Sequence, residues 1–187
     1  TQSVGFPLPL SEARIVRTAD GMTAMRGEIG EMCVRSPCVM RGYVGMPEKT
    51  RETLDAEGWL HTGDLGYMRP DGYLQITGRL KEMIIRGGEN IYPREIEDVL
   101  AEHPDVAQAA VYGVPDPKWG EQVAAALIAR PGRVPDFEEL TAFLNSRIAR
   151  HKTPRFWRLV ESFPLNASGK IQKFVLQEQF VNKSGTA

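Results

Sequence analysis

The pattern of apolar and polar positions changes near residues 78 to 81. Before this point, short apolar runs such as "ARIVRT", "GEMCVRS" and "CVMRGYV" are separated by Gly and Pro within residues 4–45. Short strands with turns between them are typical of a barrel or sandwich piece. After it, helix-like and strand-like patterns alternate. The sequence therefore predicts an α+β chain, in which an all-β piece precedes a small α+β domain.

Two further elements precede the change. Residues 47–54, "PEKTRETL", predict a short helix with proline at its first position. In residues 65–79, "LGYMRPDGYLQITGR", two alternating runs flank "RPDG". Proline presets φ, Asp favours the turn and Gly tolerates positive φ, so this segment predicts a β-hairpin.

The second part predicts three helices. Residues 92–104 place Ile96, Val99 and Leu100 on one face between two prolines. Residues 135–151 place Leu140, Phe143, Leu144 and Ile148 in a buried stripe, with Asp136 and Glu139 as a capping pair and basic residues at the C-terminal end. A final short helix is expected over residues 172–180. Strands are expected over 106–114, 123–130 and 157–163, and residues 183–187 are expected to fray.

Composition narrows the possible classes of protein. The 187 residues are 42% hydrophobic and 25% charged, with a formal net charge of −1, as in soluble globular proteins. No overall positive charge favours nucleic acid or anionic membranes. No apolar run approaches the roughly 18 residues of a transmembrane helix, and charges and prolines interrupt the first thirty residues, unlike a secretory signal. We therefore expect a cytoplasmic protein.

The two cysteines, Cys33 and Cys38, lie in "MCVRSPCVM". Two cysteines alone do not complete a zinc site, and nothing in the sequence indicates secretion. We expect reduced, partly buried thiols in a strand region, and we predict no metal site.

The stretch "FPLNASGKIQKF", residues 163–174, carries Lys170 after a glycine. It does not match the phosphate-binding loop G-x-x-x-x-G-K-[ST], because Pro164 replaces the first glycine and Ile171 replaces the hydroxyl residue. Lys170 is either an ordinary surface lysine or a partner of residues elsewhere in the chain.

A second group of candidates surrounds the change of pattern. Asp64 follows Thr-Gly in a turn, where its carboxylate either accepts hydrogen bonds from a vicinal diol such as ribose or holds its own turn. Arg79 either holds a phosphate or sugar or forms a surface ion pair. The segment 86–88, "RGG", either lets backbone approach a ligand closely or is a plain turn.

Together, "GWLHTGDLGY", "GRLKEMIIRGGENIYPREIE" and "FPLNASGKIQK" resemble three signature motifs of the AMP-forming acyl-CoA synthetases, in the family's order and spacing. The resemblance runs over essentially the whole chain. It implies a two-step reaction with ATP, Mg²⁺ and coenzyme A. A carboxylic acid forms acyl-AMP and pyrophosphate, and the thiol of coenzyme A then displaces AMP to give a thioester.

The resemblance also implies roles for particular residues. Lys170 would be the catalytic lysine of adenylation, on a flexible loop. Asp64 and Arg79 would bind the nucleotide, and Lys81 would be the hinge between a large N-terminal domain and a small mobile C-terminal one. Gly87 and Gly88 would line the path of the pantetheine arm of coenzyme A.

Trp119, in "DPKWGEQ", matches a position that stacks on the adenine of coenzyme A, although a Trp beside Pro117 and Gly120 also packs a domain. Lys152, Arg155 and Arg158 either assist the phosphates of coenzyme A or are ordinary surface charges. We predict no metal ligand in the chain, so the Mg²⁺ site would lie outside it.

The resemblance assigns residues 1–78 to the end of the large domain, 79–81 to the hinge and 82–182 to the small lid domain. The family's phosphate-binding loop and acyl pocket would precede Thr1, so we expect a C-terminal fragment that does not adenylate alone and that works with a missing N-terminal domain. "GGENIYP" and "GKIQKF" are more similar to coenzyme A ligases than to the adenylation domains of peptide synthetases. The stretch over residues 151–174, "HKTPRFWRLVESFPLNASGKIQKF", is most similar to ligases for fatty and related acids.

Two alternatives remain open at this point: an adenylation domain that loads a carrier protein, and a non-catalytic binding module. The context of Lys170 in "PLNASGK" further suggests a lysine acetyltransferase as a partner, since acetylation removes the positive charge.

Overall fold

The structure is a computed structural model that describes residues 3–184. The chain divides into two compact units, Thr1–Lys81 and Glu82–Ala187. Each unit has its own hydrophobic core, with one cluster around Ile15, Met32 and Leu74 and two larger ones in the second unit. The division falls directly after Lys81, and each unit is described separately below.

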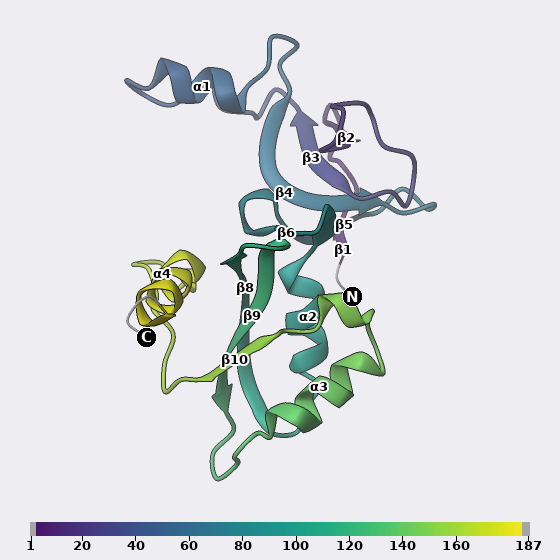
Figure 1. Ribbon diagram of the computed structural model, residues 1–187. Helices are drawn as coiled ribbons and strands as arrows, with labels where there is room; N and C mark the ends of the chain where they lie inside the picture. The colour runs from purple at the N-terminus through teal and green to yellow at the C-terminus, as the bar shows by residue number, and fades with distance from the viewer. Residues whose placement is uncertain (1–2, 185–187) are drawn as a thin grey trace. The chain divides into compact units, whose positions relative to one another are not determined.

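The first unit is a five-stranded antiparallel sheet in the order β1-β5-β4-β3-β2 (Figure 1). Its strands are β1 (Ser3–Gly5), β2 (Glu12–Val16), β3 (Gly30–Arg35), β4 (Leu60–Met68) and β5 (Leu74–Arg79). The hairpin predicted over residues 65–79 is confirmed as β4 and β5. Its turn closes when Arg69 N–H donates to the Tyr73 carbonyl at 2.8 Å, and Gly72 adopts a φ of 87° there.

The helix predicted over residues 47–54 is confirmed as α1 (Pro47–Thr53), with proline in its first turn. The strand predicted over residues 38–44 is wrong, because these residues form turns and irregular chain. Beyond the end of β3, Ser36 closes a turn: its hydroxyl accepts the Cys38 N–H at 3.2 Å and its carbonyl accepts the Val39 N–H at 3.1 Å. The apolar run therefore lacks a pairing partner, and Val44 is 99% exposed.

The second unit is built around β8 (Val106–Asp116) and β9 (Gly120–Ala129), which form an antiparallel pair along their lengths. β10 (Phe156–Leu159) pairs parallel with β9, whereas β6 (Ile84–Arg86) pairs antiparallel with it at Arg86 and Gly120. β6 and β7 (Glu89–Ile91) form a hairpin around residues 86–88, where the sequence predicts a turn but no strands. Short 3-10 turns span Leu80–Glu82 and Arg150–Lys152.

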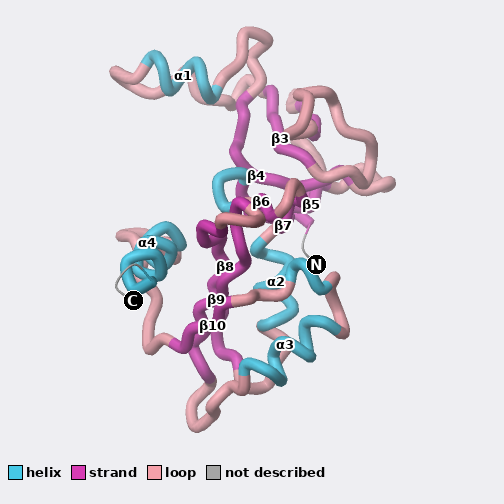
Figure 2. Tube along the Cα trace, viewed as in Figure 1, coloured by secondary structure: helices cyan, strands magenta, loops and turns pink. Residues whose placement is uncertain are grey.

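Helices cover both faces of this sheet (Figures 1 and 2). α2 (Pro93–Leu100) and α3 (Phe137–Asn145) pack against one face, and α4 (Lys173–Ser184) packs against the other. Successive strand residues alternate between the faces. Val111, Val123, Ala125 and Leu127 join the core under α2 and α3, whereas Ala110, Tyr112, Ala124 and Ala126 join the core under α4.

The predicted helices all exist, but the boundaries of three differ. α2 ends at Leu100, four residues before the predicted end at Pro104. α3 ends at Asn145, so Ile148 packs from the following turn and the basic residues predicted for its last turn lie beyond it. Its start is as expected, since the Asp136 carboxylate accepts the N–H groups of Glu138 and Glu139. α4 reaches Ser184, so the expected frayed tail is helical at residues 183–184, and residues 185–187 lie outside the described part.

The strand predicted over 157–163 is shorter as β10, because its pairing with β9 stops at Leu159. Within residues 3–184, no helix is both long and apolar enough to cross a membrane.

Candidate functional site

Two of the predicted site residues face each other across the β4–β5 hairpin. Asp64 on β4 and Arg79 at the end of β5 are paired in register. The Nε of Arg79 lies 2.7 Å from Oδ1 of Asp64, with side-chain exposures of 48% and 25%. The pair places a carboxylate acceptor and a guanidinium donor side by side at the surface, which is the chemistry needed to hold a sugar hydroxyl and a phosphate.

The turn predicted at Asp64 is wrong, because Thr62, Gly63 and Asp64 lie within β4, at an irregularity in its pairing with β3. A network of hydrogen bonds fixes this irregularity. Gly63 has a φ of 70°, which glycine adopts without strain. The Thr62 hydroxyl donates to the Met32 carbonyl at 2.7 Å and accepts the Asp64 N–H at 3.0 Å. The Gly63 N–H donates to Glu31 Oε1 at 3.0 Å. Strand β3 therefore holds the backbone that presents the Asp64 carboxylate.

Gly87, Gly88 and Trp119 are brought together in the second unit. Gly87 and Gly88 form the β6–β7 turn with φ values of 59° and 86°. The Gly87 N–H donates to the Trp119 carbonyl at 2.8 Å. A Cβ on Gly87 would lie 2.8 Å from Cε3 of the Trp119 ring, so only glycine allows the indole to lie this close to the turn.

The turn between β8 and β9 holds Trp119 in place. Asp116 Oδ1 accepts hydrogen bonds from the backbone N–H of Trp119 at 2.8 Å and from that of Lys118 at 2.9 Å. These bonds, led by the one from Trp119, hold the pKa of the Asp116 carboxyl below its ordinary value. The Arg86 guanidinium and the Lys118 ammonium each lie 4.9 Å from the indole centroid. Trp119 remains 38% exposed, so this surface combines an aromatic face with two cations.

Lys170 lies on a hydrogen-bonded turn that joins β10 to α4. Asn166 organises it: its carboxamide oxygen accepts the N–H groups of Ser168 and Lys170, each at 2.9 Å. The Asn166 N–H donates to the Lys170 carbonyl at 2.9 Å, and an isolated bridge joins Leu165 to Ile171. The Lys170 side chain is exposed, and among the described residues its ammonium has no hydrogen bond or ion pair.

The start of α4 is anchored a few residues after Lys170. Lys173 Nζ lies 2.7 Å from Oε1 of Glu97 on α2 and 3.0 Å from Oε2 of Glu82, the residue directly after Lys81. Only 16% of the Lys173 side chain is exposed. These two ion pairs hold the start of α4, the helix that follows Lys170, against α2 and against the first residue of the second unit.

Lys152, Arg155 and Arg158 are not gathered into one cluster by any contact among the described residues. Lys152 Nζ pairs with Glu95 at 2.7 Å, and Arg158 donates to Gln179 at 3.1 Å. Arg155 lines a surface groove between α3 and β10 together with Phe137 and Trp157. Their suggested role with phosphates stays a prediction.

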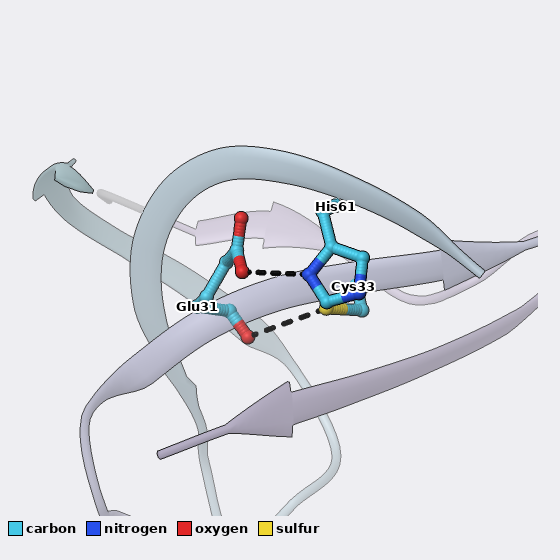
Figure 3. Close-up of side chains that lie close together, drawn as sticks. All are labelled: Glu31, Cys33 and His61. Carbon is cyan, nitrogen blue, oxygen red and sulfur yellow. Dashed lines mark hydrogen bonds and ion pairs between the residues drawn. The ribbon is translucent and has the colours of Figure 1, made fainter. Parts of the chain in front are cut away.

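Both cysteines are free thiols, but only Cys33 is buried. Cys38 is exposed, so the expectation of partial burial is wrong for it. Burial raises the pKa of the Cys33 thiol to about 11, and the negative charge of Glu31 adds to the effect. Figure 3 shows the side chains of Glu31, Cys33 and His61 pointing toward one another from β3 and β4.

Sequence reasoning did not identify several of these supporting residues. Thr62 and Glu31 support Asp64, Arg86 flanks Trp119, and Asn166 and Lys173 support the Lys170 turn. Thr62 and Asn166 had a local signal, since hydroxyl and amide side chains commonly bond their own turns. Glu31 and Lys173 act on residues distant in the sequence, so no local pattern marks them.

Two family models match the chain. The model of the AMP-binding enzyme C-terminal domain matches residues 95–170, and the model of the AMP-binding enzymes matches residues 1–44. The second match covers β1, β2 and β3, and the first covers most of the second unit.

Curated relatives match over nearly the whole chain. A putative acyl-CoA synthetase, YngI of Bacillus subtilis, is 47% identical over 180 residues, which are 96% of this chain and 33% of the relative. A fatty acid–[acyl-carrier-protein] ligase, ScoC of Streptomyces coeruleorubidus, is 43% identical over 96% of this chain and 34% of its own length. The chain thus spans about a third of the length of these relatives.

The fold of this chain is similar to that of the corresponding part of a crystal structure that contains ATP. The ATP-bound crystal structure of MatB from Rhodopseudomonas palustris superimposes with a TM-score of 0.90 at 38% identity, covering 96% of this chain and 36% of that one.

Proposed function

Because the chain belongs to the family of AMP-binding enzymes, we propose that it forms the C-terminal part of a ligase that activates a carboxylic acid with ATP. In the first step, a carboxylate oxygen attacks the α-phosphorus and pyrophosphate leaves, giving acyl-AMP. In the second, the sulfur of coenzyme A attacks the acyl carbon, the thiol proton is lost and AMP leaves. The relatives, an acyl-CoA synthetase and a fatty acid–[acyl-carrier-protein] ligase, support the activation of an acid. Coenzyme A as the acceptor of the acyl group and the identity of the acid are parts of the proposal.

Lys170 carries the proposal. Two anions, a carboxylate and a phosphate, must approach each other in the first step, and a cation between them stabilises the charge of the transition state. At about 4 Å and an effective dielectric near 20, one such contact is on the order of 4 kcal/mol. The Lys170 ammonium suits this role because it is exposed and, among the described residues, unpaired on a preformed turn.

The other residues take complementary roles in this proposal. Asp64 accepts the ribose hydroxyls and Arg79 contacts the ribose or phosphates. The Gly87–Gly88 turn admits the pantetheine arm, and Trp119 offers its exposed face to the adenine of coenzyme A. We assign no residue of this chain to the Mg²⁺ that accompanies ATP. We further propose that the substrate is a fatty or related acid, which a panel of acids tests. We also propose a cytoplasmic location, which cell fractionation tests.

Lys170→Ala in the complete enzyme tests this role. We expect acyl-AMP formation to fall by roughly a hundredfold or more, because charge stabilisation in the transition state is lost. Thioester formation from supplied acyl-AMP should persist, since that step has no need of the lysine. The two half-reactions are measured separately, with the exposed Lys49→Ala as the matched control. Equal losses in both half-reactions would assign Lys170 a structural role instead.

Acetylation of Lys170 should have the same effect as its removal, because it neutralises the ammonium. We expect the adenylation rate to fall in proportion to the acetylated fraction, as measured by mass spectrometry, and to recover after deacetylation. A lysine acetyltransferase would then be a regulatory partner. An unchanged rate at stoichiometric acetylation would contradict the proposed charge role.

A carrier-protein thiol is the second candidate acceptor, and the 43% identity to ScoC favours considering it. Offering the complete enzyme either coenzyme A or a phosphopantetheinyl carrier protein, at equal concentration, distinguishes the two by which thioester accumulates.

A further inference from the structure

A cluster of three different donor atoms lies between β3 and β4, beside the irregularity that carries Asp64. Glu31 and Cys33 come from β3, where the pairing with β4 is irregular, and His61 comes from β4. Figure 3 shows the carboxylate, thiol and imidazole converging on one small space. None of the roles proposed above uses Cys33 or His61.

The spacing of these atoms fits a single ion. His61 Nδ1 lies 2.8 Å from Glu31 Oε2 and 3.5 Å from Cys33 Sγ, and one donor atom from each residue lies within 4.8 Å of the others. Zinc bonds are about 2.0–2.2 Å to nitrogen and oxygen and about 2.3 Å to sulfur. Donors that share one zinc therefore lie roughly 3–4 Å apart, which is close to the two distances from His61 Nδ1.

We propose that Glu31, Cys33 and His61 bind a divalent transition-metal ion, for which Zn²⁺ is the best match. A thiolate and an imidazole favour zinc over Mg²⁺ or Ca²⁺, which prefer oxygen ligands. Three protein ligands leave a fourth position for water, as in zinc sites that are not closed by a fourth side chain.

Two neighbouring groups are placed to orient the side chains of His61 and Glu31 as metal ligands. The Asp55 carboxylate lies 3.8 Å from His61 Nε2, on the far side of the ring from the proposed ion. The second oxygen of Glu31 accepts the Gly63 N–H. A histidine ligand commonly directs its other nitrogen toward a carboxylate, and a carboxylate ligand is commonly hydrogen-bonded. Asp55 and Gly63 occupy these two supporting positions.

Proton balance on binding is simple. Without metal, His61 Nδ1–H donates to Glu31 and Cys33 keeps its thiol proton. With metal, the imidazole proton resides on Nε2, on the side of Asp55, and the thiol proton is released to solvent. The ion then joins β3 to β4 directly beside the irregularity that carries Asp64.

The test uses the full 187-residue chain and Co²⁺ as a spectroscopic substitute for Zn²⁺. We expect an absorption band from thiolate-to-cobalt charge transfer, which does not depend on any ligase activity. Cys38→Ser is the matched control, because the chain has only two cysteines and Cys38 is exposed. The band should persist in Cys38→Ser and disappear in Cys33→Ser.

A Zn²⁺ titration by calorimetry measures the contribution of each ligand. We expect His61→Gln and Glu31→Gln each to weaken the Kd at least about tenfold, and Asp55→Asn to weaken it about tenfold, as supporting groups do. Circular dichroism shows whether each variant is folded. If Cys33→Ser does not fold, the band in Cys38→Ser still assigns the thiolate to Cys33.

Absence of a cobalt–thiolate band in the folded chain would overturn the metal site and leave the three side chains as a hydrogen-bond network. A band that is lost in Cys38→Ser would also overturn it. Either result leaves the role of Lys170 untouched, because the two experiments share no readout.

Discussion

At the scale of single residues, the close contact between Gly87 and Trp119 limits which residues can occupy the β6–β7 turn. The indole covers the turn so closely that a methyl group on Gly87 would overlap it, whereas a Cβ on Gly88 would meet no atom within 4 Å. Both glycines have positive φ. An added Cβ therefore distinguishes them by one effect, the clash with the ring at Gly87.

This difference predicts unequal costs for two matched substitutions. Gly88→Ala should lower the free energy of unfolding by about 1 kcal/mol, from backbone strain alone. For a unit of this size, this corresponds to a lowering of Tm by about 4 °C. Gly87→Ala should cost more, because Trp119 must move. The excess should disappear in a Trp119→Ala background, and denaturant unfolding of the four variants measures it. An equal cost of both substitutions would contradict the close contact.

Site residues with local signatures could be predicted from the sequence, and their partners could not. Gly87 and Gly88 lie in a turn that a short pattern marks, and Asp64 lies within β4 directly after the Thr-Gly pair that the pattern singled out. That Asp64 forms an ion pair with Arg79 depends on the register of a hairpin, which the pattern fixed only approximately. The convergence of Glu31 and Cys33 with His61 depends on strand pairing across about thirty residues, which no local pattern contains.

At the scale of elements, the start of α4 depends on a partly buried charge cluster. Lys173 bridges Glu97 on α2 and Glu82 at the beginning of the unit. Glu97 also accepts the Val111 N–H of β8 at 2.7 Å. One ammonium therefore neutralises two carboxylates that connect a helix, a strand and the segment after Lys81.

Lys173→Met should therefore destabilise the second unit by about 1–3 kcal/mol, since it leaves two carboxylates without their shared cation. Arg94→Met is the control, because Arg94 pairs with Asp98 while 61% exposed, and such pairs contribute roughly 0–1 kcal/mol. Urea unfolding measures both. Adding Glu82→Gln to Lys173→Met should recover part of the loss. Similar costs for Lys173→Met and Arg94→Met would show that the cluster contributes no more than an exposed pair.

Amphipathic periodicity was sufficient to predict the helices and the long strands. It failed at residues 38–44, where an apolar run has no neighbouring strand, and at the ends of α3 and β10. It also missed the β6–β7 hairpin, whose strands have only three residues each. Strand length and pairing are set by neighbours in space, so these boundaries required the structure.

At the scale of the whole molecule, the chain divides into two units between Lys81 and Glu82. We propose that Lys81 is a hinge, so that the second unit presents Lys170 in one step and the Gly87–Gly88 turn in the other. A few residues at a junction can absorb such changes in φ and ψ. The Leu80–Glu82 turn is a short 3-10 segment, which allows such adjustment.

Lys81→Pro in the complete enzyme tests the hinge. Proline fixes φ and removes the backbone N–H, so the junction should be confined to one arrangement. We expect the rates of the two half-reactions to change unequally, because a junction confined to one arrangement serves one of the two steps better than the other. Lys81→Ala is the control, because it removes the charge and keeps backbone freedom. The same loss in both variants would point to the charge rather than to the backbone.

The hydrogen-bonded turn around Lys170 has a consequence for the entropy of the reaction. Ordering a free loop costs roughly 1–2 kcal/mol per residue in lost backbone conformations. The hydrogen bonds of Asn166 and the Leu165–Ile171 bridge already order the backbone of this turn in the folded protein, so this cost does not recur during the reaction. Within this turn, only the side-chain rotamers of Lys170 remain to be restricted when the lysine approaches its anions, so more of the electrostatic attraction is available to lower the barrier.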